Sequence, residues 1–438
     1  MPGPDLHRRQ LIGMVGALTA SATLGRTARA AGAALGMPPT SGLADFTLSN
    51  ATVVLHTGER LEGAGVRVER GTVIEVGRGV RGGQDLRGAW IVPGFTDAGC
   101  TVGLYEIGAE SATRDDRESS DTVTPDARVT DAYNPLSEVV PVTRAVGFSH
   151  VLVHPSPSGL VSGQAALMRT VGRTVAEATA ATPLGLCVQL GGAGKGAGGP
   201  ASRMGVAMQL RALLEEAEPP VPPTDDGRRR RGRQASSEDE DPDLSTVEQV
   251  WRDVRTGVLP VLFHADRADD LLQAVSLSEQ FGLRCVLVGG AEGWLVAEEL
   301  AASGVPVLLG PPMVQPDSFE HPHARYDNAA RLHEAGVKVA FRSGANHFAR
   351  GLRTDVGVLV AHGLPWAAAI AGLTGAVGEI FGLAGHGRLE LGRPADFFVT
   401  AGDPLQPRYP VQRMWIDGRA VSLETRQTRL RDRYESLQ

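Results

Sequence analysis

Short apolar runs alternate with amphipathic stretches along the chain from residue 91 to residue 383. The runs are rich in β-branched residues, and apolar side chains recur between them at spacings of three and four, as in Ala268–Phe281. This alternation predicts parallel strands separated by helices, and we expect a (β/α)₈ TIM barrel. After a first strand that begins at residue 91, the predicted strands lie at 151–153, 186–190, 258–263, 285–288, 305–309 and 337–341.

Two stretches depart from this alternation. Between residues 44 and 80, short alternating runs separated by glycine and polar turns predict a small antiparallel β unit. Residues 218–244 combine a proline cluster, a basic run at 228–231 and an acidic run at 238–241. Since such a segment buries too little apolar area to order itself, we expect a disordered surface insertion in the barrel.

The first thirty residues have the pattern of an export signal. Arg8 and Arg9 precede an apolar stretch at 11–24, and Ala28-Arg29-Ala30 follows as a small-x-small cleavage site. The pattern resembles a twin-arginine signal, whose pathway exports folded proteins. We therefore expect residues 1–30 to be a signal peptide and the mature protein to work in the periplasm or outside the cell. A simple amphipathic first helix is the alternative.

Composition sets limits on the partners. The 438 residues are 42% hydrophobic, enough for a barrel and a smaller appendage. The net charge of −7 gives no electrostatic reason to expect nucleic acid as a partner. No apolar stretch after the first thirty residues is long enough to predict a transmembrane segment in the mature chain.

The first motif that bears on function is at residues 93–104, Pro-Gly-Phe-Thr-Asp-Ala-Gly-Cys-Thr-Val-Gly-Leu. This run resembles the amidohydrolase superfamily, in its imidazolonepropionase-like branch, where PGFxDAHxHxGL carries two histidines that bind a catalytic metal. Gly99 and Thr101 stand at the two histidine positions. The resemblance also implies that a small composite β-sandwich domain, built from residues 44–90 and 387–425, flanks a barrel at 91–386. The run at 387–399 matches the family's G-x-L-x-x-G-x-x-A-D pattern.

The resemblance implies further metal ligands at the ends of later strands, and most of these are missing too. Gly192 replaces a glutamate, Gly289 replaces a histidine, and Gly344 replaces the aspartate that binds metal and acts as general base. His264 is the one ligand histidine that survives. Glycine has no side-chain donor, and a lone imidazole cannot hold zinc against water, so we expect no metal cofactor.

These positions lead to a first hypothesis and two alternatives. We expect an exported amidohydrolase-like protein without an intact metal site, acting as a non-catalytic binding or partner subunit. Its partner would be a second copy or an active amidohydrolase homologue. One alternative is an active hydrolase of carbon–nitrogen bonds in cyclic amides or dipeptide-like substrates, with a rebuilt site that uses zinc or another divalent metal. The other is a barrel that captures a small anion through Arg267 and Lys195. The candidate pocket residues are His154, Lys195, His264 and Arg267.

Overall fold

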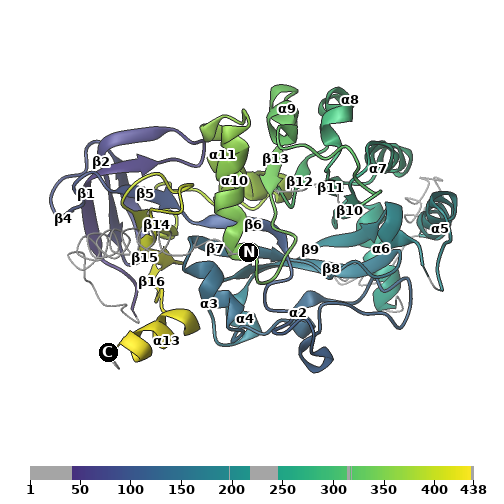
Figure 1. The fold of residues 1–438 in the computed structure, drawn as a ribbon, viewed down its shortest axis with the longest axis horizontal. Coiled ribbons are helices and arrows are strands. Elements are labelled where there is room, and N and C mark those ends of the chain that lie inside the picture. Colours follow the sequence, from purple (N-terminus) through teal and green to yellow (C-terminus); the bar gives the residue numbers. More distant parts are fainter. Residues whose placement is uncertain (1–41, 197, 218–244, 313–315, 317, 436–438) are drawn as a thin grey trace, which may run out of the picture.

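The structure is a computed structural model that describes residues 42–196, 198–217, 245–312, 316 and 318–435. The predicted signal peptide at 1–30 and the predicted insertion at 218–244 lie outside these residues. In the described part of the chain the strands form two sheets, one from both chain ends and one from the middle of the chain (Figure 1).

The first sheet joins the two ends of the chain. Its order is β16-β15-β14-β5-β1-β2-β3, and β4 pairs with β1. Strands β5 and β14 are antiparallel, with Val92 opposite Phe398, so a C-terminal strand lies directly beside an N-terminal one. This pairing confirms the predicted composite β unit, whose strands form one connected sheet. The strands are β1 (Phe46–Val54), β2 (Arg60–Glu69), β3 (Thr72–Gly77), β4 (Gln84–Asp85), β5 (Trp90–Pro93), β14 (Phe397–Thr400), β15 (Val411–Ile416) and β16 (Arg419–Ala420).

The second sheet is the barrel. Its strands follow in the order β6 to β13, and the two ends meet where the Gly344 amide donates to the Gly99 carbonyl at 2.9 Å. A second bond, from the Thr101 amide to the Ala345 carbonyl, is 3.2 Å long. The predicted barrel is thus confirmed, but its first strand begins at Phe95 and not at residue 91, because Trp90–Pro93 pairs with β14 and β1 as strand β5 of the first sheet. Its strands are β6 (Phe95–Cys100), β7 (Phe148–Val153), β8 (Val161–Arg169), β9 (Thr179–Gln189), β10 (Val261–Ala265), β11 (Cys285–Gly289), β12 (Val307–Leu309) and β13 (Val339–Phe341).

One barrel strand differs from the simple alternating pattern. Strand β8 is antiparallel to both neighbours, β7 and β9, whereas the other neighbouring pairs of the barrel sheet are parallel. Antiparallel neighbours need no crossover helix, so β7, β8 and β9 follow one another through short connections. The sequence does not predict β8, because Ser162, Gly163 and Gln164 interrupt its apolar residues and make its start resemble a loop. The strand therefore shows neither the continuous apolar run of a buried strand nor the polar alternation of a half-exposed one.

Helices surround the barrel sheet (Figure 1). Helix α7 has the predicted bounds, with Asp269 and Asp270 in its first turn and left-handed Gly282 after its last residue. Helix α13, near the C-terminus, was not predicted. The helices are α2 (Val129–Ala132), α3 (Val139–Arg144), α4 (Val175–Ala178), α5 (Arg203–Glu216), α6 (Thr246–Arg255), α7 (Ala268–Phe281), α8 (Ala297–Ser303), α9 (Asn328–Glu334), α10 (Leu352–Ala361), α11 (Trp366–Leu373), α12 (Gly375–Phe381) and α13 (Arg426–Glu435). No helix in the described ranges is long and apolar enough to cross a membrane.

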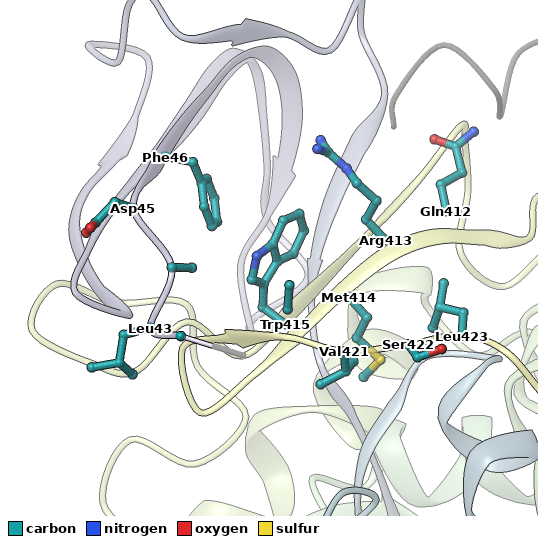
Figure 2. Close-up of a pocket in the computed structure, with 13 residues that line it drawn as sticks. Leu43, Asp45, Phe46, Gln412, Arg413, Met414, Trp415, Val421, Ser422 and Leu423 are labelled. Carbon is teal, nitrogen blue, oxygen red and sulfur yellow. The ribbon is translucent and has the colours of Figure 1, made fainter. Parts of the chain in front are cut away.

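The two sheets share a buried aromatic contact. Phe95 of β6 packs against Phe148 and Phe398, with ring centroids 5.8 and 5.0 Å apart. All three rings are fully buried, so the barrel and the composite sheet are packed directly against each other. A cavity of about 370 Å³ lies at the edge of the composite sheet, where Phe46 and Trp415 line it (Figure 2). None of its lining residues belongs to a barrel strand.

Candidate functional site

A cavity of about 430 Å³ lies at the carboxyl ends of the barrel strands. Catalytic and binding residues of TIM barrels are found at these ends, because the loops that follow the strands converge there. The lining residues that end a strand or lie close to its end are Thr101, His154, Gln189, His264, Gly289 and Arg342.

The structure brings most of the positions that were singled out in the sequence to this cavity. The substituted ligand positions that line it are Thr101, Gly192, Gly289 and Gly344. Gly99 lies behind them, against the side chain of Arg342. Both His154 and His264 also line the cavity.

Two of the candidate pocket residues do not line the cavity. Arg267 forms two hydrogen bonds to the Asp269 carboxylate, at 2.9 and 2.7 Å, on the exposed start of α7. Lys195 lies 3.9 Å from Glu320 at the rim. Neither residue lines the cavity. An anion inside the cavity would therefore not contact Arg267 or Lys195 as the sequence predicts.

Three arginines of the described chain line the cavity. Arg114 and Arg117 are the more exposed two and lie 3.1 and 3.7 Å from the Asp116 carboxylate, and the third is Arg342, the first residue after β13. Its side chain is buried, with the whole residue 8% exposed. Nη1 donates to the Gly310 carbonyl at 2.9 Å, and Nη2 donates to Nε2 of His154 at 3.1 Å. Burial lowers the pKa of Arg342, but an arginine remains protonated in a protein. The cavity therefore holds a fixed guanidinium charge.

Arg342 occupies the space beside two of the substituted ligand positions. A Cβ atom at residue 99 would lie 2.8 Å from Nε of Arg342, and one at residue 344 would lie 3.1 Å from its Nη2. Real Cβ atoms are essentially never found closer than 3.0 Å to another heavy atom. Restoring a side chain at Gly99 therefore requires Arg342 to move.

Carboxylates occupy the space at two further positions. A Cβ at residue 192 would lie 2.8 Å from Cδ of Glu320, whose carboxylate accepts a hydrogen bond of 3.0 Å from the Gly192 amide. A Cβ at residue 289 would lie 2.6 Å from Oδ1 of Asp266. At these positions, the space of the missing ligand side chain is therefore occupied by a side chain from another segment of the chain.

Two of the histidines that line the cavity, His154 and His264, are neutral. Burial and, to a smaller extent, the Arg342 charge lower the pKa of His154 to about 3. Because Nε2 of His154 accepts from Arg342, its proton sits on Nδ1, which donates to the Pro155 carbonyl at 2.9 Å. The His264 ring lies 5.0 Å from the His154 ring, and burial also lowers its pKa well below the usual value. Nε2 of His264 is buried without a hydrogen-bond partner.

Two buried aspartates lie close to Arg342. Burial raises the pKa of Asp97 to about 6, although hydrogen bonds from Ser343 and Gly99 act in the opposite direction. Burial also raises the pKa of Asp266, which accepts a hydrogen bond from the Ala291 amide at 3.2 Å. The negative charges of both carboxylates raise the pKa of Arg342 and so favour its protonated form. Within the described part of the chain, however, neither they nor any other carboxylate forms an ion pair with it.

Comparison with solved structures places this geometry in a family. A crystal structure of an amidohydrolase from Thermotoga maritima is similar at 26% identity and a TM-score of 0.76, over 86% of this chain and 99% of that chain. This chain belongs to the amidohydrolase superfamily. No protein-family model matches the sequence, and no curated protein does. The imidazolonepropionase-like branch remains a prediction from the sequence.

Two more distant structures share the amidohydrolase fold. Molinate hydrolase has a TM-score of 0.53 at 13% identity, over 88% of this chain and 96% of that chain. A prolidase complexed with N-methylphosphonate-L-proline has a TM-score of 0.50 at 16% identity, over 86% of this chain and 99% of that chain. At these identities the similarity concerns the fold alone.

The amidohydrolase metal does not fit the residues of this cavity. Metal ligands need lone pairs, and the guanidinium of Arg342 has only N–H donors and a positive charge. Across the described ranges, no group of three or more His, Cys, Asp or Glu side chains is arranged to hold a metal ion. The donor atoms in the cavity therefore do not form a metal centre like that of the family, and no reaction step is assigned to one.

Three residues of this amidohydrolase cavity were missed by the sequence analysis. Arg342 carried a usable signal, because it is a lone charge directly after an apolar predicted strand, where a barrel places its functional side chains. Asp266 carried a weaker signal of the same kind after β10. Glu320 carried none, since it belongs to a loop more than a hundred residues beyond Gly192, the residue that it contacts.

Acid should weaken the fold through His154. Its pKa in the folded chain, about 3, lies below its value of 6.5 in the unfolded chain, so only the unfolded chain takes up the proton between these values. Stability therefore falls as pH decreases from 6.5 towards 3, by up to ~1.4 kcal/mol per pH unit from this residue. His154→Gln, which can still accept from Arg342, should flatten the fall by that amount in urea titrations. An unchanged slope would show that His154 is not neutral in the folded chain.

Proposed function

We propose that this chain is an exported, non-catalytic member of the amidohydrolase superfamily that acts as a binding or partner subunit. The observation that carries the proposal is the position of Arg342. Its guanidinium lies against Gly99 and Gly344, where the family's resemblance puts metal ligands of the first and last barrel strands. A fixed cation at that point repels a metal ion rather than binding it.

The other polar groups in and directly beside the cavity are mostly engaged in structural contacts. Nε2 of His154 is used by Arg342, and both oxygens of Asp97 accept hydrogen bonds from Ser343 or Gly99. Asp116, at the rim, accepts two hydrogen bonds of 3.1 Å from Arg114. Burial alone would raise the pKa of Asp116, but bonds from Arg114 and Ser156 hold it below its usual value. Groups held in this way are poor candidates for general bases.

One observation favours a second candidate function, a hydrolase of carbon–nitrogen bonds with a rebuilt site. Nε2 of His264 is unpartnered, and the same cavity contains the Arg342 guanidinium. A neutral imidazole can accept a proton, and a guanidinium can stabilise a developing oxyanion. We rank this function second, because the depressed pKa of the buried imidazole makes it a weak base.

Exposed apolar side chains support the partner role. Ile107, Phe319 and Phe348 are 57%, 96% and 77% exposed, on loops that adjoin the cavity. The loops of Ile107 and Phe348 lie side by side, with Nε2 of His347 2.6 Å from the Glu106 carbonyl oxygen, and apolar side chains exposed together mark protein interaction sites. On the present proposal, the barrel mouth faces a second copy of the chain or a catalytically intact homologue.

Metal analysis tests the proposal directly. The purified mature protein should contain no stoichiometric zinc or other transition metal by elemental analysis. Its melting temperature should be unchanged by EDTA or 1,10-phenanthroline, because no bound metal contributes to its stability. Turnover of a panel of cyclic amides and dipeptides should stay at the level of a buffer blank. One tightly held metal per chain, or turnover that His264→Gln abolishes, would refute the non-catalytic role.

Export is tested through the paired arginines. Replacing Arg8 and Arg9 with lysines keeps the charge, yet the precursor should accumulate in the cytoplasm, because paired arginines are the feature a twin-arginine pathway recognises. Fractionation of the producing cells followed by immunoblotting measures this. A matched replacement of Arg26 and Arg29 with lysines should leave export unchanged. If the Arg8/Arg9 variant is exported at the normal rate, the chain uses another route.

A further inference from the structure

The barrel cavity contains a buried charge without a direct counter-charge. The two hydrogen bonds of Arg342, to Gly310 and His154, use two of its five N–H groups, and both acceptors are neutral. Its Nε is buried with no partner. A buried charge is costly unless it is paired and hydrogen-bonded. The geometry around Arg342 therefore leaves room for an anion.

Two further polar groups in the same lining are also unsatisfied. Oε1 of Gln189 is buried without a partner, while Nε2 of the same amide donates to Ser162 at 3.3 Å. The Gln189 amide can also sit with its NH₂ group in the place of Oε1 if the Ser162 hydroxyl, which donates to the Ser158 carbonyl at 3.2 Å, turns to donate to the amide oxygen instead. Neutral His264 can carry its proton on the unpartnered Nε2. Arg342, Gln189 and His264 can therefore all present N–H donors to one occupant.

We propose that the barrel mouth binds a small molecule with a single carboxylate, held by the guanidinium of Arg342. This inference rests on the non-catalytic function proposed above and names the class of its ligand. A planar carboxylate matches the guanidinium fork, and the additional donors of Gln189 and His264 suit its remaining lone pairs. A cavity of about 430 Å³ accommodates a molecule larger than acetate and smaller than a peptide.

The surrounding carboxylates define the charge of this ligand. Asp266 and Glu320 line the cavity together with Arg342. Glu320 is already paired with Arg203, and the lining arginines Arg114 and Arg117 are paired with Asp116. The charge of Arg342 acts on Asp266 without a direct ion pair between them. A second negative group on the ligand would meet these carboxylates and be repelled. The site therefore selects monocarboxylates over dicarboxylates and phosphate.

The test measures binding of defined probes to the full mature protein. Isothermal titration calorimetry compares benzoate, 4-bromobenzoate and butyrate with succinate and inorganic phosphate. We expect saturable binding of the monocarboxylates and at least about tenfold weaker binding of the other two probes. Arg342→Met should weaken benzoate binding at least about tenfold, because it removes the charged donors but keeps similar bulk. Arg267→Met is the matched control; it removes a positive charge outside the cavity and should leave affinity within about twofold.

A second measurement uses the unaltered protein, because Arg342→Met removes a buried group and can weaken the fold. Crystals soaked in 4-bromobenzoate should show an anomalous bromine peak in the cavity and the carboxylate against Arg342. Absence of saturable binding, equal binding by the Arg342→Met protein, preference for succinate or phosphate, or bromine elsewhere would each overturn the assignment. If these tests fail while the protein is metal-free and inactive, only the ligand class is wrong. A bound metal or measured turnover refutes the proposed function instead.

Discussion

Replacing Asp97 with alanine should lower the free energy of unfolding by about 3–5 kcal/mol. Oδ1 of Asp97 accepts hydrogen bonds of 3.0 Å from the amides of Gly99 and Ser343, and Oδ2 accepts from the Ser343 hydroxyl. These bonds link β6, the first barrel strand, to the segment that follows β13, the last. Alanine would leave the two amides buried without partners at the point where the barrel closes.

The control for this prediction is Asp97→Asn. The asparagine carbonyl oxygen can accept from both amides, and its NH₂ group can donate to the Ser343 hydroxyl. We expect its loss of stability, measured by urea unfolding at pH 7.5, to be less than half that of the alanine variant. Equal losses would show that the negative charge beside Arg342, rather than the hydrogen bonds, stabilises the closure.

Much of the fold was predictable because the barrel strands are buried on both faces. Such strands appear in the sequence as short apolar runs, and the helices between them have apolar residues at spacings of three and four. The same rule explains the failure at β8. Its small and apolar residues are buried like those of its neighbours, but Gly163 and the preceding serines resemble a loop. Its antiparallel direction depends on pairing with β7 and β9, which local pattern does not encode.

The site was predictable only in part, for a related reason. The substituted positions could be found because each lies in a motif at the end of a strand. The side chains that fill the vacated space come from distant segments, and only the folded chain shows that Glu320 reaches Gly192 or that Asp266 reaches Gly289. The sequence accordingly predicts an empty metal site with basic groups at Arg267 and Lys195. The structure has a filled site whose buried positive charge is that of Arg342.

This difference changes what the cavity can do. An empty site could regain a metal by single substitutions that restore ligands. A filled site resists such changes, because each restored side chain collides with a group that now belongs to the packing of the mouth. Hydrogen bonds with Gly310, Ala291 and Gly192 hold the side chains of Arg342, Asp266 and Glu320, respectively, in place. A cavity lined by such fixed polar groups selects one ligand geometry more strongly than a flexible cavity would.

Replacing Gly289 with alanine should destabilise the fold by about 3 kcal/mol, from the cost of a positive φ and the loss of the Asp266 contact. Gly289 has a φ of +110°, and a Cβ there would lie 2.6 Å from Oδ1 of Asp266 and 2.8 Å from the Ala265 carbonyl oxygen. The backbone oxygen cannot rotate away, and moving Asp266 would break its bond to the Ala291 amide. A histidine at residue 289 should be worse still, and should bring no metal with it.

Two matched glycines separate the causes of this loss. Gly304 has a φ of +69° and open space around it, so Gly304→Ala should cost about 1 kcal/mol for its backbone conformation alone. Gly108 is not in the positive φ region and meets no atom closer than 3.9 Å, so Gly108→Ala should change stability by less than about 0.5 kcal/mol. Urea unfolding of the three variants measures the differences. A cost at Gly289 no larger than that at Gly304 would mean that Asp266 does not fill the histidine's space and that the vacated site remains open to a metal ligand.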